Sequence, residues 1–176
     1  AHSLGATPLA MRQMMQAQHV GKVVVQSAAR LPASACMSAL VTGGLGTLGQ
    51  VTAAWLAGHS AYAMSLLGRS GHFGADCAAQ FAQLVRHSAT CVSAERLDVG
   101  AAGEACTVGS LGQQPPTTAV MHAGGVLQDA TLANQTARSM WAPAAGKVYG
   151  AVHLLEAHAA SPLQMMVMFS SVAALL

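Results

Sequence analysis

Charged residues are scarce in this sequence of 176 residues. Asp, Glu, Lys and Arg make up only 8% of it, and 8 Lys and Arg against 6 Asp and Glu give a formal net charge of +2. The charges are scattered singly along the chain, so the basic stripe of a nucleic-acid-binding surface is missing. Because 53% of the residues are hydrophobic, the composition is also far from that of a disordered chain. We expect a folded chain that does not bind nucleic acid.

Long apolar runs are missing as well, although no charged residue occurs between Arg30 and Arg69. Glycines, together with Pro32, Gln50 and His59, interrupt this stretch before any run approaches the roughly 20 residues that a bilayer requires. The sequence therefore predicts a buried core and no membrane association.

The 4 cysteines lack the spacing of a metal site. Cys36, Cys77, Cys91 and Cys106 form no CxxC pair, so we predict no metal site. We expect reduced, buried thiols, as in cytosolic proteins. The opening residues show no secretory signal, and the chain begins at Ala1 rather than Met. The sequence therefore predicts a cytoplasmic protein and a piece of a longer chain.

Short apolar runs alternate along the chain with longer stretches of helical periodicity. Strands are expected at 37–42, 61–68, 91–97, 118–123 and 163–171. Helices are expected at 47–58, 75–87, 101–111 and 139–158. Such alternation implies a parallel sheet that is covered on both faces through right-handed crossovers. The predicted fold class is therefore α/β, a Rossmann-type doubly wound parallel sheet, which binds ligands beyond the carboxyl ends of its strands.

A glycine-rich motif, TGGLGTLG, follows the first expected strand and opens the first expected helix. Gly44, Gly46 and Gly49 supply its GxGxxG pattern. Glycines allow a tight turn and a close approach of pyrophosphate to the helix N-terminus, whose free N–H groups favour anions. The residues predicted to bind a dinucleotide here are Thr42, Gly43, Gly44, Gly46, Thr47, Leu48 and Gly49. A glycine-rich turn without a ligand is the alternative.

The end of the second expected strand distinguishes between NAD and NADP. An acidic residue there would bind the ribose 2′-hydroxyl of NAD, but this strand ends in Leu67, Gly68, Arg69 and Ser70. A guanidinium beside a hydroxyl suits the 2′-phosphate of NADP. We therefore predict NADPH as cofactor, with Arg69 and Ser70 as ligands of that phosphate; a solvated surface charge is the alternative for Arg69.

Several ordered motifs resemble one known family. TGGLGTLG, LLGRSG, LDVG, HAGGVLQDATL, APAAGKVYGAVHLLE and MFSSVA occur in the order found in the ketoreductase domains of type I polyketide synthases, members of the short-chain dehydrogenase/reductase superfamily. The resemblance implies NADPH-dependent reduction of a β-ketoacyl thioester to the β-hydroxyacyl form. Its implied partners are an acyl carrier protein, which carries the substrate on phosphopantetheine, and the neighbouring domains of a polyketide or fatty acid synthase.

The resemblance also implies catalytic residues. Ser171, the second serine of MFSSVA, matches the serine that hydrogen-bonds the substrate ketone, and Lys147 matches the lysine that contacts the nicotinamide ribose. The family's catalytic tyrosine should follow beyond Leu176, and Tyr62 and Tyr149 are on the wrong elements to replace it. We therefore expect a truncated ketoreductase whose final strands and helix are missing, and no turnover by the chain alone.

Further positions carry over from the same family. Asp98 matches the aspartate near the adenine amine, and Val99 after it matches a residue that packs against that ring; an exposed turn aspartate is the alternative for Asp98. Ala123 and Gly124, in HAGG, lie where the cofactor passes, and His122 before them is expected to be structural rather than catalytic.

One more motif bears on stereochemistry. LQD at 127–129 corresponds to the family's LDD motif, and Asp129 keeps its diagnostic last position although Gln128 departs from it. Asp129 thus predicts a D-configured hydroxyl product.

The first segment differs from the rest. Residues 10–26 resemble the end of an enoylreductase domain that precedes the ketoreductase in fully reducing synthases. The alternative is an N-terminal flank of the ketoreductase itself. We predict a flank or linker at 1–35 and a partial NADP-binding ketoreductase domain at 36–176.

Two other functions remain open. A free-standing short-chain dehydrogenase would carry Tyr-x-x-x-Lys downstream and would leave Lys147 without a catalytic role. A non-catalytic nucleotide-binding remnant would account for the absence of the tyrosine.

Overall fold

The computed structural model describes residues 2–3, 6, 8–9, 12, 16, 25–26, 37–59, 61–87, 89–110, 116–161 and 163–170. The chain divides into two compact units, Ala1–Ser34 and Ala35–Leu176. In the first unit, β1 (His2–Ser3) pairs in parallel with β2 (Val25–Gln26). The assignment of residues 1–35 to a linker or a preceding domain stays a prediction.

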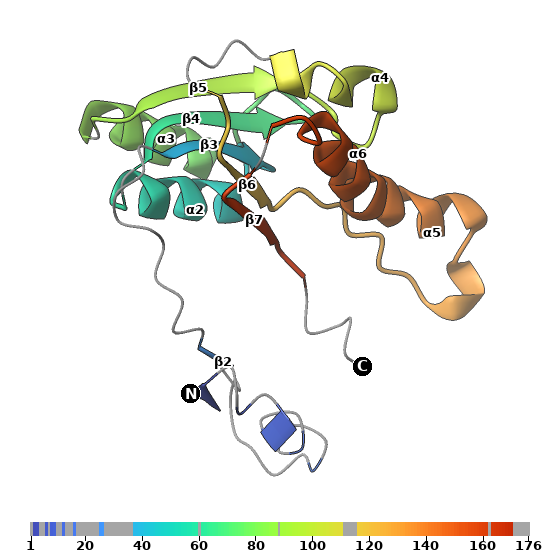
Figure 1. Cartoon of the computed structure of the whole chain (residues 1–176). Coiled ribbons are helices and arrows are strands. Elements are labelled where there is room, and N and C mark those ends of the chain that lie inside the picture. The colour runs from blue at the N-terminus through green and yellow to red at the C-terminus, as the bar shows by residue number, and fades with distance from the viewer. Residues whose placement is uncertain are drawn as a thin grey trace. The chain divides into compact units, whose positions relative to one another are not determined.

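The described part of the second unit is built on a five-stranded parallel sheet of order β5-β4-β3-β6-β7 (Figure 1). Its strands are β3 (Met37–Thr42), β4 (Ala61–Gly68), β5 (Cys91–Arg96), β6 (Ala119–His122) and β7 (Met165–Met168). The chain first winds outward from β3 and then returns to its other side at β6. A sheet of this order has its switch point between β3 and β6.

Helices connect the strands and cover both faces of the sheet. They are α2 (Thr47–Ala57), α3 (Ala75–His87), α4 (Ala102–Ala105), α5 (Ala137–Ala144) and α6 (Gly150–Ala157), with short 3₁₀ turns η2 (Val108–Ser110) and η3 (Leu132–Asn134). The predicted α/β, Rossmann-type doubly wound fold is confirmed.

Two apolar cores lie on opposite faces because side chains alternate along a strand. Ala39 and Val41 of β3 pack with Leu56 of α2 in one core. Leu40 of β3 packs with Leu154 of α6 in the other. All six residues of β3 are buried, as expected for a central strand of a parallel sheet that is covered on both faces.

The prediction of one regular helix at 139–158 is wrong in its start and in its continuity. The structure has α5, then a π-helical turn η4 (Ala145–Tyr149), then α6. Helix α5 also begins earlier than predicted, because Thr136 caps it. The Ser139 N–H donates to Thr136 Oγ1 at 3.1 Å, and the Thr136 N–H donates to Ser139 Oγ at 2.9 Å.

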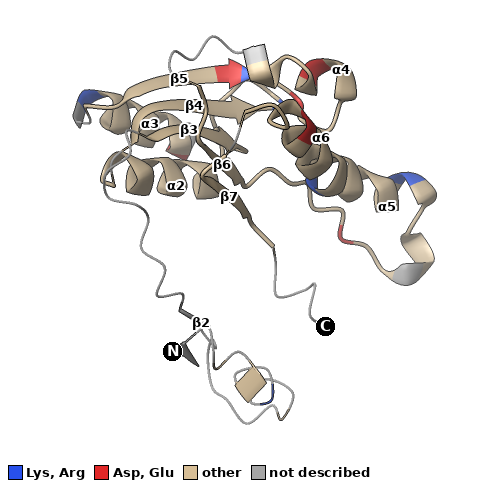
Figure 2. Ribbon diagram, in the orientation of Figure 1, with Lys and Arg blue, Asp and Glu red and all other residues tan. Residues whose placement is uncertain are grey.

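Charged residues are few along the ribbon, and two of opposite sign, Glu95 and Arg96, are adjacent at the end of β5 (Figure 2). Arg96, at the end of β5, forms an ion pair with Glu104 of α4 at 3.7 Å, and both side chains are well exposed. An exposed pair of this kind contributes at most about 1 kcal/mol. Apolar burial therefore stabilises the sheet far more than ion pairs do.

The structure bears on membrane-spanning helices, metal-ligating clusters and the burial of the cysteines. None of the helices among the described residues is both long and apolar enough to cross a membrane. No group of three or more potential metal-ligating side chains occurs within the same residues. The expectation of buried thiols is wrong for Cys91 and Cys106, which are exposed, and right for Cys77; Cys36 lies outside the described residues.

Two adjacent leucines on α6 allow a matched test of the second core. Leu154 is 0% exposed and Leu155 is 54% exposed. We expect Leu154→Ala to lower the free energy of unfolding by about 2–5 kcal/mol, because it removes buried methyl groups and leaves a cavity. Leu155→Ala should change it by less than about 1 kcal/mol. Urea denaturation of the two variants checks this, and equal losses would contradict the packing described.

Candidate cofactor site

The turn between β3 and α2 is shaped by glycines. Gly43 has a φ of 66°, and a Cβ on it would lie 2.8 Å from Ala123 O. A Cβ on Gly49 would overlap Gly43 O, whereas one on Gly46 would meet nothing closer than 3.5 Å. Two of these positions therefore require glycine for close backbone packing, and the third does not.

Helix α2 starts directly after this turn, at the carboxyl edge of the sheet. Its N-terminus begins at Thr47 and has no side-chain cap. The first N–H groups of such a helix lack intrahelical partners and favour an anion. Of the predicted ligands, Thr47 and Leu48 thus lie in the first turn of a helix suited to a phosphate.

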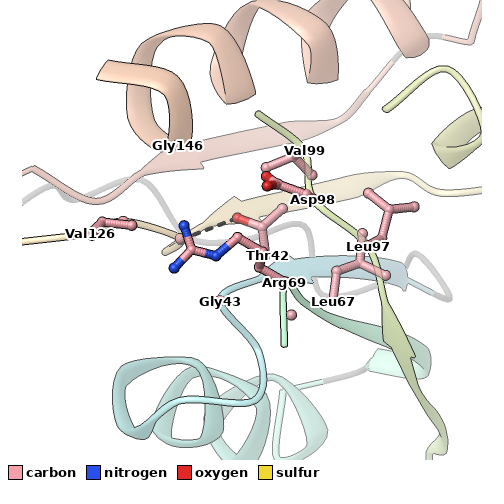
Figure 3. A pocket seen from close by; sticks show the side chains of 12 residues that line it. Thr42, Gly43, Leu67, Arg69, Leu97, Asp98, Val99, Val126 and Gly146 are labelled. Carbon is pink, nitrogen blue, oxygen red and sulfur yellow. Dashed lines mark hydrogen bonds between the residues drawn. The ribbon is translucent and has the colours of Figure 1, made fainter. Parts of the chain in front are cut away.

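A cleft of about 130 Å³ opens beyond the carboxyl ends of β3, β4, β5 and β6 (Figure 3). It is lined by Thr42, Gly43, Leu67, Gly68, Arg69, Leu97, Asp98, Val99, Gly124, Gly125, Val126 and Gly146. The structure therefore brings together six of the predicted cofactor residues: Thr42, Gly43, Arg69, Asp98, Val99 and Gly124. The remaining predicted residues are not in the lining: Gly44, Gly46, Thr47, Leu48, Gly49, Ser70 and Ala123.

Arg69 lies on the tight turn that ends β4. The Gly71 N–H donates to Gly68 O at 3.2 Å, and Gly71 has a φ of 68°. Ser70 Oγ donates to His72 O at 3.1 Å and so belongs to this turn. Within the described ranges Arg69 has no salt-bridge partner. Its guanidinium is therefore an uncompensated positive charge in the lining of the cleft (Figure 3).

Asp98 follows β5 and is fixed by its own turn. The Gly100 N–H donates to Asp98 Oδ1 at 2.9 Å, and the Asp98 N–H donates to Glu104 Oε2 at 2.9 Å. The next residue, Val99, accepts a 2.8 Å hydrogen bond at its carbonyl from His153 Nδ1 of α6. Two helices thus hold this side of the cleft.

Lys147 lies on the π turn η4 and is not itself in the lining of the cleft, although Gly146 before it is. A Cβ on Gly125 would lie 2.8 Å from Lys147 Cε, so the absence of a side chain at Gly125 makes room for the lysine stem. Gly125 and Gly146 both line the cleft. Neither residue was predicted from the sequence, although both have a sequence signal: Gly125 is the second glycine of HAGG, and Gly146 directly precedes Lys147.

The structure does not bring the other two predicted functional residues into this cleft. Ser171 lies outside the described residues, and β7 ends at Met168. Asp129 is exposed on the loop after β6 and does not line the cleft. That loop is held by Gln135 Nε2, which donates to Gln128 O at 3.2 Å and to Ala130 O at 3.4 Å. The role of Asp129 in product configuration stays a prediction.

The sequence and fold match one family. The model of the KR domain matches residues 37–176. The chain belongs to this family. It is a ketoreductase domain of the type I polyketide synthase kind, in the short-chain dehydrogenase/reductase superfamily, as the resemblance had predicted.

Relatives of this KR domain are large synthases. It is 32% identical to the highly reducing polyketide synthase g433 of Fusarium sp, over 95% of this chain and 7% of that protein. It is 34% identical to polyketide synthase GfsB of Streptomyces halstedii, over 98% of this chain and 3% of that protein. The chain therefore spans a small part of the curated relatives it matches.

Solved ketoreductases share the fold of this KR domain. An N-terminal ketoreductase from a macrolactin assembly line matches with a TM-score of 0.72 and 29% identity, over 80% of this chain and 29% of that one. A-type ketoreductases from a modular polyketide synthase match with a TM-score of 0.72 and 32% identity, over 79% of this chain and 30% of that one. The KR domain thus covers about a third of these ketoreductase chains.

Buried His122 makes the stability of this edge depend on pH. Burial is the main cause that lowers the pKa of its imidazole from 6.5; the Lys147 ammonium lowers it further, and hydrogen bonds to the Lys147 and Gly146 carbonyls partly oppose this. The folded chain therefore binds fewer protons than the unfolded chain just below pH 6.5. The stability associated with neutral His122 is complete above that pH and is lost as the pH falls toward the folded pKa.

We expect the wild-type chain to lose more free energy of unfolding between pH 7.5 and pH 5.5 than the His122→Asn variant, in which this titration is missing. Urea denaturation at the two pH values measures both losses, and the comparison cancels the titration of the other histidines. Equal losses in the two proteins would contradict a lowered pKa at His122.

Proposed function

We propose that this KR domain uses NADPH to reduce a β-ketoacyl thioester to the β-hydroxyacyl form, with the substrate carried on the phosphopantetheine of an acyl carrier protein. The observation that carries the proposal is the cleft at the switch point of the sheet, where Arg69 and the fixed Asp98 lie beside the glycine turn. Arg69 has no salt-bridge partner in the part of the chain that the structure describes. Membership of the KR family supports the type of reaction.

The residues present fit a dinucleotide phosphate. The close-packed turn at Gly43 and the uncapped start of α2 at Thr47 and Leu48 would hold the pyrophosphate. Arg69, with Ser70 beside it, would bind the 2′-phosphate through charge-assisted hydrogen bonds.

The rest of the cleft would hold the two ends of the cofactor. Asp98 and Val99 would contact the adenine, and Ala123 and Gly124 would lie along the path toward the nicotinamide. These two small residues continue directly from β6, whose last residue, His122, is buried. The cleft therefore has an adenine side after β5 and a nicotinamide side after β6.

Two side chains would carry the chemistry of the substrate. NADPH, when bound, supplies the hydride, and the proton that converts the resulting alkoxide into the hydroxyl would come from the family's catalytic tyrosine. Lys147, whose stem passes Gly125 at the cleft, would bind the ribose hydroxyls and add positive charge where the carbonyl oxygen becomes negative. Ser171 would donate a hydrogen bond to the substrate ketone and so orient it.

The proposed partners follow from the relatives. They are polyketide synthases many times longer than this chain, so we propose that neighbouring synthase domains and an acyl carrier protein deliver the substrate. A free-standing dehydrogenase is less well supported, because the curated matches quoted above are synthases. A remnant that binds the nucleotide without catalysis would bind NADPH and give no product.

Replacement of Arg69 tests the cofactor preference. We expect Arg69→Ala to weaken NADPH binding about 10- to 100-fold and to leave NADH binding unchanged. The expected factor corresponds to the loss of a charge-assisted hydrogen bond, which contributes about 1.5–3 kcal/mol. Fluorescence titration of the full-length protein with each nucleotide measures this. Arg86→Ala, on the last turn of α3 away from the cleft, is the matched control.

An equal loss of NADPH and NADH affinity in Arg69→Ala would contradict the role of Arg69 at the 2′-phosphate. Absence of NADPH binding by the wild-type protein would contradict the proposed function itself.

A further inference from the structure

A row of three hydrogen bonds joins the glycine turn to the π turn. The Gly124 N–H donates to Thr42 Oγ1 at 3.2 Å, and Thr42 Oγ1 lies 2.7 Å from His122 Nδ1; Figure 3 draws the first of these bonds. On the other side of the ring, His122 Nε2 lies 3.2 Å from the carbonyl oxygen of Lys147. The ends of β3 and β6 are thus connected to η4 through one imidazole.

Chemistry assigns the direction of each bond in this row. The Lys147 carbonyl can only accept, so His122 Nε2 must carry the proton. A neutral imidazole has one N–H, so Nδ1 is an acceptor and the Thr42 hydroxyl donates to it. Thr42 Oγ1 then accepts from the Gly124 N–H. Every member is satisfied in this arrangement, whereas the other tautomer would place the lone pair of Nε2 against the carbonyl oxygen.

The surroundings favour a neutral ring. His122 is only 3% exposed. Burial disfavours its charged form, and the Lys147 ammonium is the charged group that acts on it, which lowers its pKa in the same direction. The ring also contacts Thr42 of β3, the backbone of η4 and Gly150 of α6. Each of these is uncharged.

Glycines shape the space on both sides of this contact. A Cβ on Gly150 would lie 3.1 Å from His122 Cε1, so the ring packs directly against the start of α6. Gly125 leaves the corresponding room for the Lys147 stem. A π turn adds one residue to a helical turn and is common at functional sites. The carbonyl that His122 binds belongs to the lysine carried by that turn.

We propose that His122 is a positioning residue, which donates from Nε2 to the Lys147 carbonyl and thereby holds the π turn so that the Lys147 side chain reaches the cleft. This rests on the proposed function, in which Lys147 acts at the nicotinamide side. His122 itself does not touch the reacting atoms. Its hydrogen bond fixes the backbone from which the lysine extends.

The tautomer of His122 tests the hydrogen bond independently of activity. Long-range ¹H–¹⁵N NMR of the full chain at pH 7 should show a neutral ring with its proton on Nε2. A proton on Nδ1, or a doubly protonated ring, would overturn the proposal. Because this measurement needs neither nucleotide nor substrate, its result is separate from the outcome for the proposed function.

Two variants then separate positioning from packing. His122→Gln places an amide N–H near the position of Nε2 and can still donate to the Lys147 carbonyl. His122→Asn keeps a partner for Thr42 but is too short to reach that carbonyl. In the full-length protein, we expect His122→Asn to lower kcat for reduction of a soluble β-ketoacyl thioester at least about tenfold, with little change in KM, because a small displacement of a catalytic group has a large effect on rate. His122→Gln should recover most of that loss.

His158 supplies the matched control. It is also a buried histidine, and its Nδ1 donates to Leu154 O at 2.8 Å at the far end of α6. His158→Asn should lower stability without lowering kcat. Equal loss of kcat in His122→Gln and His122→Asn, or the same loss in His158→Asn, would overturn positioning by His122. If the wild-type protein binds NADPH but gives no product, the proposed reaction fails while the tautomer still decides the hydrogen bond.

Discussion

The close approach of the turn after β3 to the chain after β6 is the constraint on which this site depends. At Gly43 a side chain would collide with the backbone of Ala123 and Gly124, so the two segments can meet only because glycine stands there. The positive φ of Gly43 then directs the chain into α2, whose free N–H groups start at the same edge. The contact between Gly43 and the chain after β6 therefore brings together two segments that line the cleft. It also fixes the direction in which α2, with its helix dipole, leaves the sheet.

The two apolar cores pack against the sheet whose carboxyl edge carries the site. Each face of the parallel sheet is covered by helices, and the turns that follow β3, β4, β5 and β6 line one cleft. The backbone of their own turns holds Arg69 after β4 and Asp98 after β5, whereas Gly124 after β6 is held by its N–H bond to the Thr42 side chain of β3. Lys147 comes from the helical side through the π turn, and His122 joins that turn to the strands.

Much of this arrangement could be predicted from the sequence. β3 and β4 are continuous apolar runs bounded by glycines, and the structure places them at 37–42 and 61–68 as predicted. The glycine motif and Arg69 have distinctive residue types at fixed places in that pattern. The family followed from several motifs in order, and the match over 37–176 confirms it.

Other features of the structure could not be predicted, because neither residue type nor periodicity indicates them. A π turn adds one residue to a helix of unchanged apolar character, so periodicity could not separate η4 from α5 and α6. The cap at Thr136 uses serine three residues later rather than Glu or Gln, and so it was missed. Exposure of Cys91 depends on the edge position of β5 in the sheet, which composition does not reveal. The link from His122 to the Lys147 carbonyl joins a side chain to backbone far along the chain.

The central claim is that a dinucleotide binds at the edge organised by Gly43. Amide NMR of the full chain during titration with NADPH tests it most directly. The account predicts that the largest shift changes fall on the glycine turn and on the turns that carry Arg69 and Asp98. Changes confined to the opposite edge of the sheet, or no saturable change at all, would contradict it.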